Sequence, residues 1–197
     1  MAQSNVYSLN VVGYYNVTVP AGGYYMVANQ LNTTNNTLGG LIPAPADGSQ
    51  FYKYNGGYTT ATFDALGGAW DLPGVTLNPG EAGFFKDPTG GAGQVLTFVG
   101  EVLQGTLVNT LPVGNSVRSS IVPQQATLTV LGVPAEDGDQ AYVYNGGYAT
   151  STYDGLAAAW DTAGSPGGPT INVGQGFFYK KAAGGTATSW VRNFTVQ

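Results

Sequence analysis

Aspartates are the residues of this chain whose type and spacing best suit chemistry. Three pairs recur about 90 residues apart, and Asp139 adds a further acid to the second set. Paired carboxylates can hydrolyse a glycosidic bond, and acid-rich loops can bind Ca²⁺. The calcium candidates are Asp47, Asp137 and Asp139, because they lie together with glycines in predicted loops. The pairs are Asp47 with Asp137, Asp64 with Asp154, and Asp71 with Asp161.

Turn formation is the simpler role for the same aspartates, and it is the one we favour. The chain has no D-x-D-x-D-G loop with a distal Glu, which calcium loops of the EF-hand type require. We expect the first pair to begin Asx-turns, the second to cap one or two helical turns, and the third to end them. A pair of hydrolytic acids would also have to be specialised, and the duplicated acids show no such difference. We therefore predict no enzyme activity, metal or cofactor.

Composition excludes most other reactive sites. The 197 residues include no His and no Cys, which removes His-dependent triads, zinc fingers, thiolate nucleophiles and disulfides. Charged residues make up 9% of the chain, the net charge is −5, and hydrophobic residues reach 43%. The six basic residues are too few for a nucleic-acid footprint. No apolar run reaches the roughly 18 residues of a transmembrane helix, so we expect no membrane insertion.

Aromatic residues are abundant, with 13 Tyr, 8 Phe and 3 Trp. Exposed aromatic rings beside amides and hydroxyls suit carbohydrate binding. Aromatic enrichment also marks protein–protein contacts. Composition alone does not separate a sugar ligand from a second copy of the chain.

An internal repeat organises the sequence. Residues 54–71 (YNGGYTTATFDALGGAWD) and 144–161 (YNGGYATSTYDGLAAAWD) are identical at 12 of 18 positions. A period this long, present twice, indicates duplicated domains rather than a solenoid. We predict one domain over residues 1–103, including an N-terminal strand, and a second over 104–197, ending in a C-terminal strand.

Both copies read as all-β. Short aromatic and β-branched runs alternate with Gly, Pro, Asn and Asp, which is the pattern of strands and turns. The NGG sequences predict hairpin tips that place Tyr54 opposite Tyr58 and Tyr144 opposite Tyr148. We expect Trp70 and Trp160 to be core residues. The predicted fold is two tandem, homologous β-sandwich or barrel-like domains with at most a short helical turn in each.

Strand-like segments occur at both ends of the chain and at its middle. Residues 6–13 resemble 94–100, and 189–197 occupy the equivalent place in the second copy. We expect the terminal strands to lack a partner within the chain. Unpaired strand edges bind other chains readily.

The repeated motifs also resemble a known group. VPAG, YNGGY followed by T-(F/Y)-D and W, and TLNPGEAGFF are similar to motifs of largely uncharacterised secreted bacterial proteins of verrucomicrobial type. The resemblance covers nearly the whole chain and implies export and a tandem β architecture. It implies no catalytic residue. Ala2-Gln3 also suits the residues left around a signal-peptide cleavage site, so we expect an extracellular or cell-surface location.

The leading functional hypothesis is a secreted structural protein that assembles with itself, head to tail, into an extracellular filament, tube or sheet. Low charge weakens repulsion between copies, and strand edges provide contacts. The alternative is a carbohydrate-binding or adhesive module whose partner is a polysaccharide. The expected assembly interface consists of Val6, Tyr7, Leu9, Val11, Tyr54, Tyr58, Tyr144, Tyr148, Trp190 and Phe194.

Overall fold

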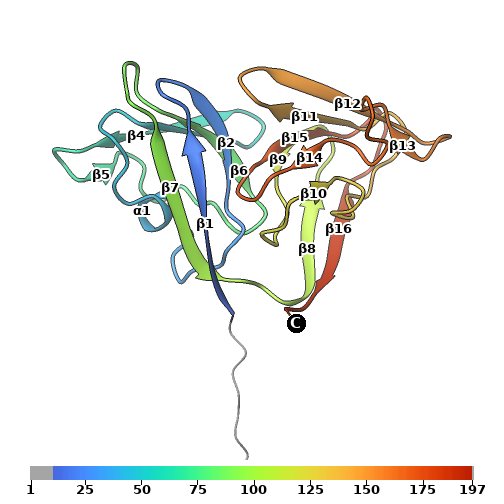
Figure 1. Cartoon of the computed structure of the whole chain (residues 1–197), viewed down its shortest axis with the longest axis horizontal. Coiled ribbons are helices and arrows are strands. Elements are labelled where there is room, and N and C mark those ends of the chain that lie inside the picture. Colours follow the sequence, from blue (N-terminus) through green and yellow to red (C-terminus); the bar gives the residue numbers. More distant parts are fainter. Residues whose placement is uncertain (1–10, 197) are drawn as a thin grey trace, which may run out of the picture.

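The computed structural model describes residues 11–196 and shows an all-β protein in two similar halves (Figure 1). Every ladder between named strands lies within 12–101 or within 105–194. The described residues contain a single helix, α1 (Leu38–Leu41). The strands of the first half are β1 (Val12–Val19), β2 (Tyr24–Ala28), β3 (Gln50–Tyr54), β4 (Tyr58–Asp64), β5 (Ala69–Trp70), β6 (Ala82–Lys86) and β7 (Gln94–Glu101). Those of the second half are β8 (Gly105–Leu111), β9 (Asn115–Arg118), β10 (Ala126–Thr127), β11 (Gln140–Tyr144), β12 (Tyr148–Asp154), β13 (Ala159–Trp160), β14 (Thr170–Ile171), β15 (Phe177–Lys180) and β16 (Thr188–Phe194).

The first half is a five-stranded antiparallel sheet, in the order β2-β6-β3-β4-β5, covered by the two-stranded ribbon β1-β7. Alternation along the ribbon decides which side chains face the sheet. Tyr15, Val17 and Val19 point inward from β1, and Leu96 and Phe98 point inward from β7. They form one core with the inner face of the sheet.

The second half repeats this arrangement. Its sheet has the order β13-β12-β11-β15-β9, and the ribbon β8-β16 corresponds to β1-β7. The ladders show which residues of the two halves are equivalent. Tyr24 pairs with Lys86 in the first half, and Asn115 pairs with Lys180 in the second, so Tyr24 corresponds to Asn115. The short ladder β10-β14 of the second half corresponds to an isolated bridge between Thr37 and Thr76 in the first.

The predicted hairpins are confirmed, since Tyr54 pairs with Tyr58 and Tyr144 with Tyr148. The segments after Asp64 and Asp154 form hydrogen-bonded turns rather than the expected helical turns. Their many glycines and alanines bury no face that would stabilise a helix. Helix α1 lies elsewhere, where Thr37 caps it by accepting the Gly40 N–H.

The tryptophans are core residues. Trp70 and Trp160 are buried as expected. Trp190, a predicted assembly residue, is 2% exposed, and its indole N–H donates to the Leu131 carbonyl at 2.8 Å. Its ring therefore stabilises the second domain and is closed to a second chain.

The terminal strands also differ from expectation, because both are paired within the chain. β1 pairs with β7 and β16 with β8. Strand β1 begins at Val12, just after Val11, and residues 6–10 of the predicted N-terminal strand lie outside the described residues. The two ribbons converge, so that the start of β1 and the end of β16 lie at the same end of the molecule (Figure 1).

The two halves pack about a pseudo-two-fold axis. Val27 bridges to Gln175, and Arg118 bridges to Glu81. The ladders make Val27 equivalent to Arg118 and Gln175 equivalent to Glu81, so the same contact is made twice. Such an isologous contact is closed and uses both copies of its surface. The contact between halves therefore leaves no equivalent surface for repeating it head to tail between chains.

Candidate ligand-binding grooves

The repeated aspartates accept hydrogen bonds from backbone N–H groups of nearby turns and strands, although the first pair does not begin the Asx-turns that we expect. Asp47 accepts the Ala65 N–H at 2.9 Å, and Asp137 accepts the Gly155 N–H at 2.8 Å. The other two pairs do the same for backbone N–H groups nearby. Asp64 accepts from Leu66, Asp154 from Leu156 and Ala157, Asp71 from Thr62, and Asp161 from Thr152.

The calcium candidates do not converge. Asp139 is fully buried and bound to Lys181, whereas Asp47 and Asp137 occupy equivalent turns in different halves. Within residues 11–196 no three acidic side chains gather as a metal site would need.

Aromatic side chains instead form two open grooves. Groove A has a volume of about 350 Å³, and groove B about 370 Å³. These volumes lie at the lower end of the range for small-ligand sites. Groove A is lined by Tyr24, Tyr52, Tyr58, Phe84 and Tyr144. Groove B is lined by Tyr54, Asn115, Tyr142, Tyr148, Thr150 and Phe178.

Strand alternation explains why these rings share a face. Tyr52 and Tyr54 are two residues apart on β3, so their side chains leave the same side of the sheet while Phe51 enters the core. Phe84 is the ladder partner of Tyr52 on β6, and Tyr58 is the partner of Tyr54 on β4. The outer face of the sheet therefore carries a cluster of aromatic rings.

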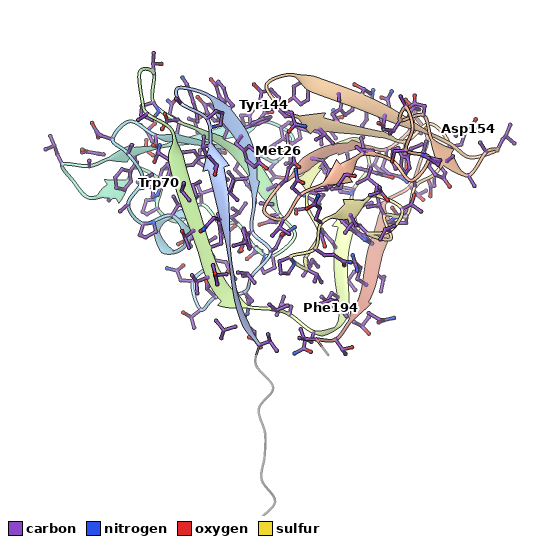
Figure 2. All side chains as sticks on the ribbon, in the orientation of Figure 1. Met26, Trp70, Tyr144, Asp154 and Phe194 are labelled. Carbon is purple, nitrogen blue, oxygen red and sulfur yellow. The ribbon has the colours of Figure 1, made fainter. Side chains whose placement is uncertain are left out.

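Each groove is completed by the other half. Tyr144 packs edge-on against Phe84, with ring centroids 5.3 Å apart, and Tyr54 packs against Phe178 at 5.4 Å. Figure 2 shows Tyr144 and Met26 between the two halves. Met26 is fully buried in the small core beneath the rings. The two grooves exist only because the halves are joined.

The grooves lie side by side and stay neutral. Tyr54 contacts Tyr58, and Tyr144 contacts Tyr148, each at 5.3 Å, which links the grooves into one aromatic surface. Burial, and the nearby Tyr58 and Tyr144 hydroxyls, raise the pKa of Tyr148 to about 12. Burial likewise raises the pKa of Tyr58. Both hydroxyls are therefore un-ionised hydrogen-bonding groups at neutral pH.

The grooves are equivalent but not identical. Where groove A has Tyr24, groove B has the exposed Asn115. Lys86 lies with its ammonium 5.5 Å from the centroid of the Tyr24 ring, at the border of groove A. Groove A is consequently the more aromatic of the two, and groove B offers an amide and the Thr150 hydroxyl.

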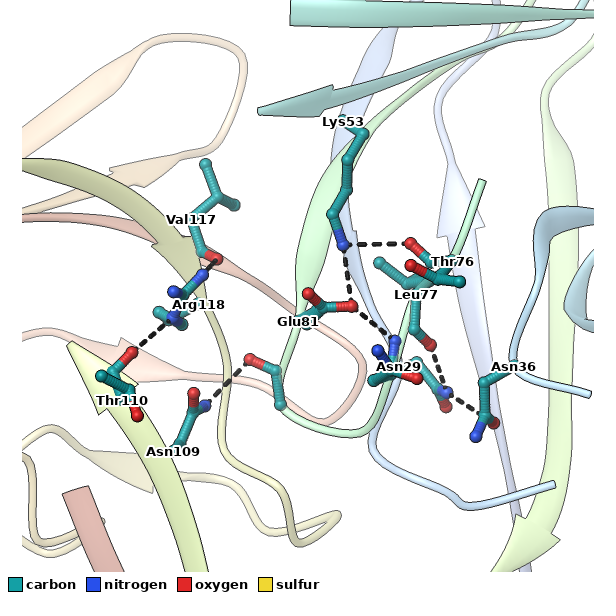
Figure 3. A network of polar contacts seen from close by, with 12 residues as sticks. Asn29, Asn36, Lys53, Thr76, Leu77, Glu81, Asn109, Thr110, Val117 and Arg118 are labelled. Atoms are coloured by element: carbon teal, nitrogen blue, oxygen red, sulfur yellow. Dashed lines mark hydrogen bonds and ion pairs between the residues drawn. The ribbon is translucent and has the colours of Figure 1, made fainter. Parts of the chain in front are cut away.

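A charged pocket of about 380 Å³ has lining residues from both halves and shares Tyr54 with groove B. Figure 3 shows the polar contacts of its residues Lys53, Glu81 and Arg118. Lys53 donates to Glu81 at 2.8 Å and to the Thr76 carbonyl at 3.0 Å. Arg118 donates to the carbonyls of Thr110 and Val117. Burial lowers the pKa values of Lys53 and Arg118, and Glu81 partly opposes both shifts. Each of these bonds lies within one half, whereas Asn109 crosses the junction by donating to the Gly80 carbonyl at 3.0 Å.

The expected assembly residues have mixed positions. Val6, Tyr7 and Leu9 lie outside the described residues. Val11 and Phe194 pack against the first core, although Phe194 belongs to β16. Tyr54 and Tyr144 are half-buried and contact the other half of the same chain. Tyr58 and Tyr148 are 53% and 54% exposed and line the grooves.

Several groove residues were missed by sequence reasoning. Tyr52, Tyr142, Phe84 and Phe178 are not among the predicted contact residues. The repeated Q-x-Y-x-Y pattern carried the signal, because period-2 tyrosines share one face of a strand. The partnership between halves had no such signal, since it depends on how the domains dock.

The described part of the chain contains no helix long and apolar enough to cross a membrane. Comparison of the chain with protein-family models, curated proteins and solved structures finds no match. The motif resemblance to secreted bacterial proteins therefore stays a prediction, and function has to be argued from the grooves.

Proposed function

We propose that this protein is a non-enzymatic, secreted module that binds a neutral polysaccharide in grooves A and B. The observation that carries the proposal is the pair of equivalent aromatic grooves on one face. Tyr58 and Tyr148 are each about half exposed and lie with other rings on one face, and contiguous exposed apolar patches mark interaction sites. Sugar rings stack their C–H faces on such aromatic rings.

The chemistry of the lining favours a neutral glycan over other ligands. The lining residues of both grooves carry no formal charge, so they offer no ion pair to a phosphate or a carboxylate, and Lys86 lies only at the border of groove A. Un-ionised tyrosine hydroxyls, Asn115 and Thr150 can donate to and accept from sugar hydroxyls. Few polar groups set in an aromatic wall are typical of small-ligand sites.

The duplication favours a polymer over a single sugar. Two adjoining sites of similar lining fit a chain that presents similar units at regular intervals. A polymer that occupies both grooves gains affinity through the high effective concentration of the second site.

Electrophoresis in native gels containing hydroxyethyl cellulose, xylan or galactomannan tests the proposal. We expect at least one polymer to retard the wild-type protein. Replacing both Tyr58 and Tyr148 by Ala should abolish that retardation. Tyr14→Ala is the matched control, because Tyr14 is 76% exposed on β1 and lies outside both grooves. Absence of retardation by every polymer, or equal loss in the control, contradicts the proposal.

Self-assembly into an extracellular filament, tube or sheet is a second proposal, supported by the ribbons. In the described structure each ribbon strand has one ladder partner, and among the isolated bridges of that part of the chain only Asn32–Glu101 occupies the other edge of a ribbon strand. The outward faces carry exposed, uncharged pairs such as Tyr14 with Val99 and Val108 with Val191. Natural proteins commonly protect such edges with charges. The ribbon of a second copy of the chain would bind this surface. Light scattering measured over a range of protein concentrations tests the assembly.

A further inference from the structure

We propose that Lys181 and Asp139 are the site of an intramolecular amide cross-link, formed with loss of one water molecule. Lys181 directly follows β15, and Asp139 directly precedes β11. The two residues therefore lie just beyond the ladder pair Gln140 and Lys180. Both side chains are fully shielded from solvent, and Lys181 Nζ lies 2.9 Å from Asp139 Oδ2. An amine and a carboxyl group held together in a dry site react as if at very high concentration.

The groups around the pair suit each step of the condensation. Glu136 is the third member, with Oε2 2.9 Å from Lys181 Nζ and its carboxylate 46% exposed. Tyr179 donates its hydroxyl proton to Asp139 Oδ2 at 2.6 Å, and the Ala182 N–H donates to Oδ1 at 2.8 Å. One carboxyl oxygen therefore has proton donors around it, while the other faces a backbone N–H.

The reaction balances without an outside reagent. Lys181 passes one proton to Asp139 Oδ2, which leaves a neutral amine and a carboxylic acid. The amine lone pair then attacks Cγ, the new C–N bond forms, and charge moves onto Oδ1 beside the Ala182 N–H. Glu136 takes a second proton from nitrogen and delivers it to Oδ2. The C–Oδ2 bond breaks, water leaves, and the C=O bond re-forms.

The ion pair is the starting state of this reaction. Burial opposes ionisation of Asp139, but hydrogen bonds from Tyr179, from the Glu136 and Ala182 N–H groups and from Lys181 outweigh it and lower its pKa. Burial alone would lower the pKa of Lys181, yet the two acids raise it. Glu136, the one exposed member, gives the amine a path for its proton. Desolvation also makes an isolated buried ion pair costly, and the amide removes both charges.

The first half of the chain provides an internal comparison. Ser49 stands where the second half has Asp139, and Asp87 stands where it has Lys181. Gln94 connects Ser49 and Asp87 by hydrogen bonds, and this site has no amine. A covalent tie in the second half would stabilise a cysteine-free chain in the way a disulfide does elsewhere.

Intact-mass spectrometry of the purified protein, after incubation at neutral pH, tests the proposal. We expect a mass lower than that of the sequence by one water, and tryptic peptides joined through Asp139 and Lys181 with the bond after Lys181 uncut. Glu136→Gln, at an exposed site, should keep the fold by circular dichroism and retain the full mass. Lys180→Met should still lose water, because Lys180 is exposed and lies outside the triad.

A wild-type protein at full sequence mass overturns the proposal. So does a water loss that peptide mapping assigns to an aspartyl-glycine pair, because such pairs can close to a succinimide without any lysine. The pairs are Asp47-Gly48, Asp137-Gly138 and Asp154-Gly155.

Discussion

Tyr54 of the first half lies edge-on to Phe178 of the second, with ring centroids 5.4 Å apart. The equivalent pair, Tyr144 and Phe84, repeats the contact at 5.3 Å. Each hairpin tip therefore supplies a wall of the groove that belongs to the other half. The interface between the halves and the candidate ligand site are one structure, and a change in the first should alter the second.

Gly176→Ala should loosen this interface. A Cβ at position 176 would lie 2.3 Å from the Cβ of Ala82 and 3.1 Å from Met26 Cγ, both in the first half. Overpacking of this kind costs about 1–3 kcal/mol. We expect a lower free energy of unfolding in urea and weaker polysaccharide binding in the same variant.

Gly147→Ala is the control for that experiment, because a Cβ there meets nothing within 4 Å. We expect its free energy of unfolding to stay within about 0.5 kcal/mol of wild type. If Gly176→Ala and Gly147→Ala have the same free energy of unfolding, the junction of the halves accommodates the extra methyl group and the prediction is wrong.

Phe51 and Gly83 should be energetically coupled. A Cβ on Gly83 would lie 2.5 Å from the Phe51 ring, whereas the second half has Ala141 and Phe177 at the equivalent positions. Phe51→Ala should cost about 3–5 kcal/mol, because it leaves a cavity. Gly83→Phe alone should also destabilise, by overpacking.

The double variant Phe51→Ala/Gly83→Phe copies the second half and should recover part of the loss. A double-mutant cycle from urea unfolding measures this coupling. If the losses in free energy of unfolding of the two single variants simply add in the double variant, Phe51 and Gly83 are not coupled and the prediction is wrong.

Asp87 should make stability fall in acid. Burial opposes its ionisation, but N–H groups of Gly22, Gln94 and Gly93 outweigh burial and lower its pKa. A carboxylate with a folded-state pKa below its unfolded value stabilises the protein above the unfolded pKa, near 3.9, and the contribution is lost as pH falls through the folded pKa. Asp87→Asn should therefore be less stable than wild type at pH 7.

The difference between wild type and Asp87→Asn should shrink as the pH falls below about 4, because protonation removes the wild-type advantage. Urea unfolding at a series of pH values measures it. A difference that stays constant across this range would contradict the shift of the Asp87 pKa.

Charges on the ribbons should separate the second proposal from the first. Val99→Lys and Val191→Lys add lysines to two exposed faces, and edge lysines oppose strand association. If copies assemble through the ribbons, light scattering at high concentration should fall to the monomer value while polysaccharide binding persists. Unchanged polymers in this double variant would place the contacts elsewhere.

Much of the fold could be predicted from the sequence, because its signals are local. Asn-Gly turns and alternating aromatics specify the hairpins at Tyr54 and Tyr144, and the repeat specifies two similar halves. The pairing of β1 with β7 and of β8 with β16 joins segments distant in sequence, and no local pattern encodes such ladders. Trp190 is an example. The sequence predicts that it lies in a strand, but not that its side chain faces the core.

The candidate site was predicted in part. Tyr58 and Tyr148 were singled out as contact residues, but their neighbours Phe84 and Phe178 come from β6 and β15, and the far wall comes from the other half. Docking of the halves rests on shape complementarity around Met26, Ala82 and Gly176, which a linear pattern does not show. The exchange of Ser49 and Asp87 for Asp139 and Lys181 was likewise hidden, because each residue alone is unremarkable.

The most direct test of the central claim is isothermal titration calorimetry of short and long oligosaccharides from whichever polymer retards the protein. Occupation of both grooves predicts that affinity rises with chain length, and that Tyr58→Ala and Tyr148→Ala each remove at least about tenfold of the affinity for the long ligand. Each single variant should bind the short ligand at its remaining groove. Affinity that does not depend on chain length, or that survives loss of both tyrosines, would contradict a two-groove polysaccharide site.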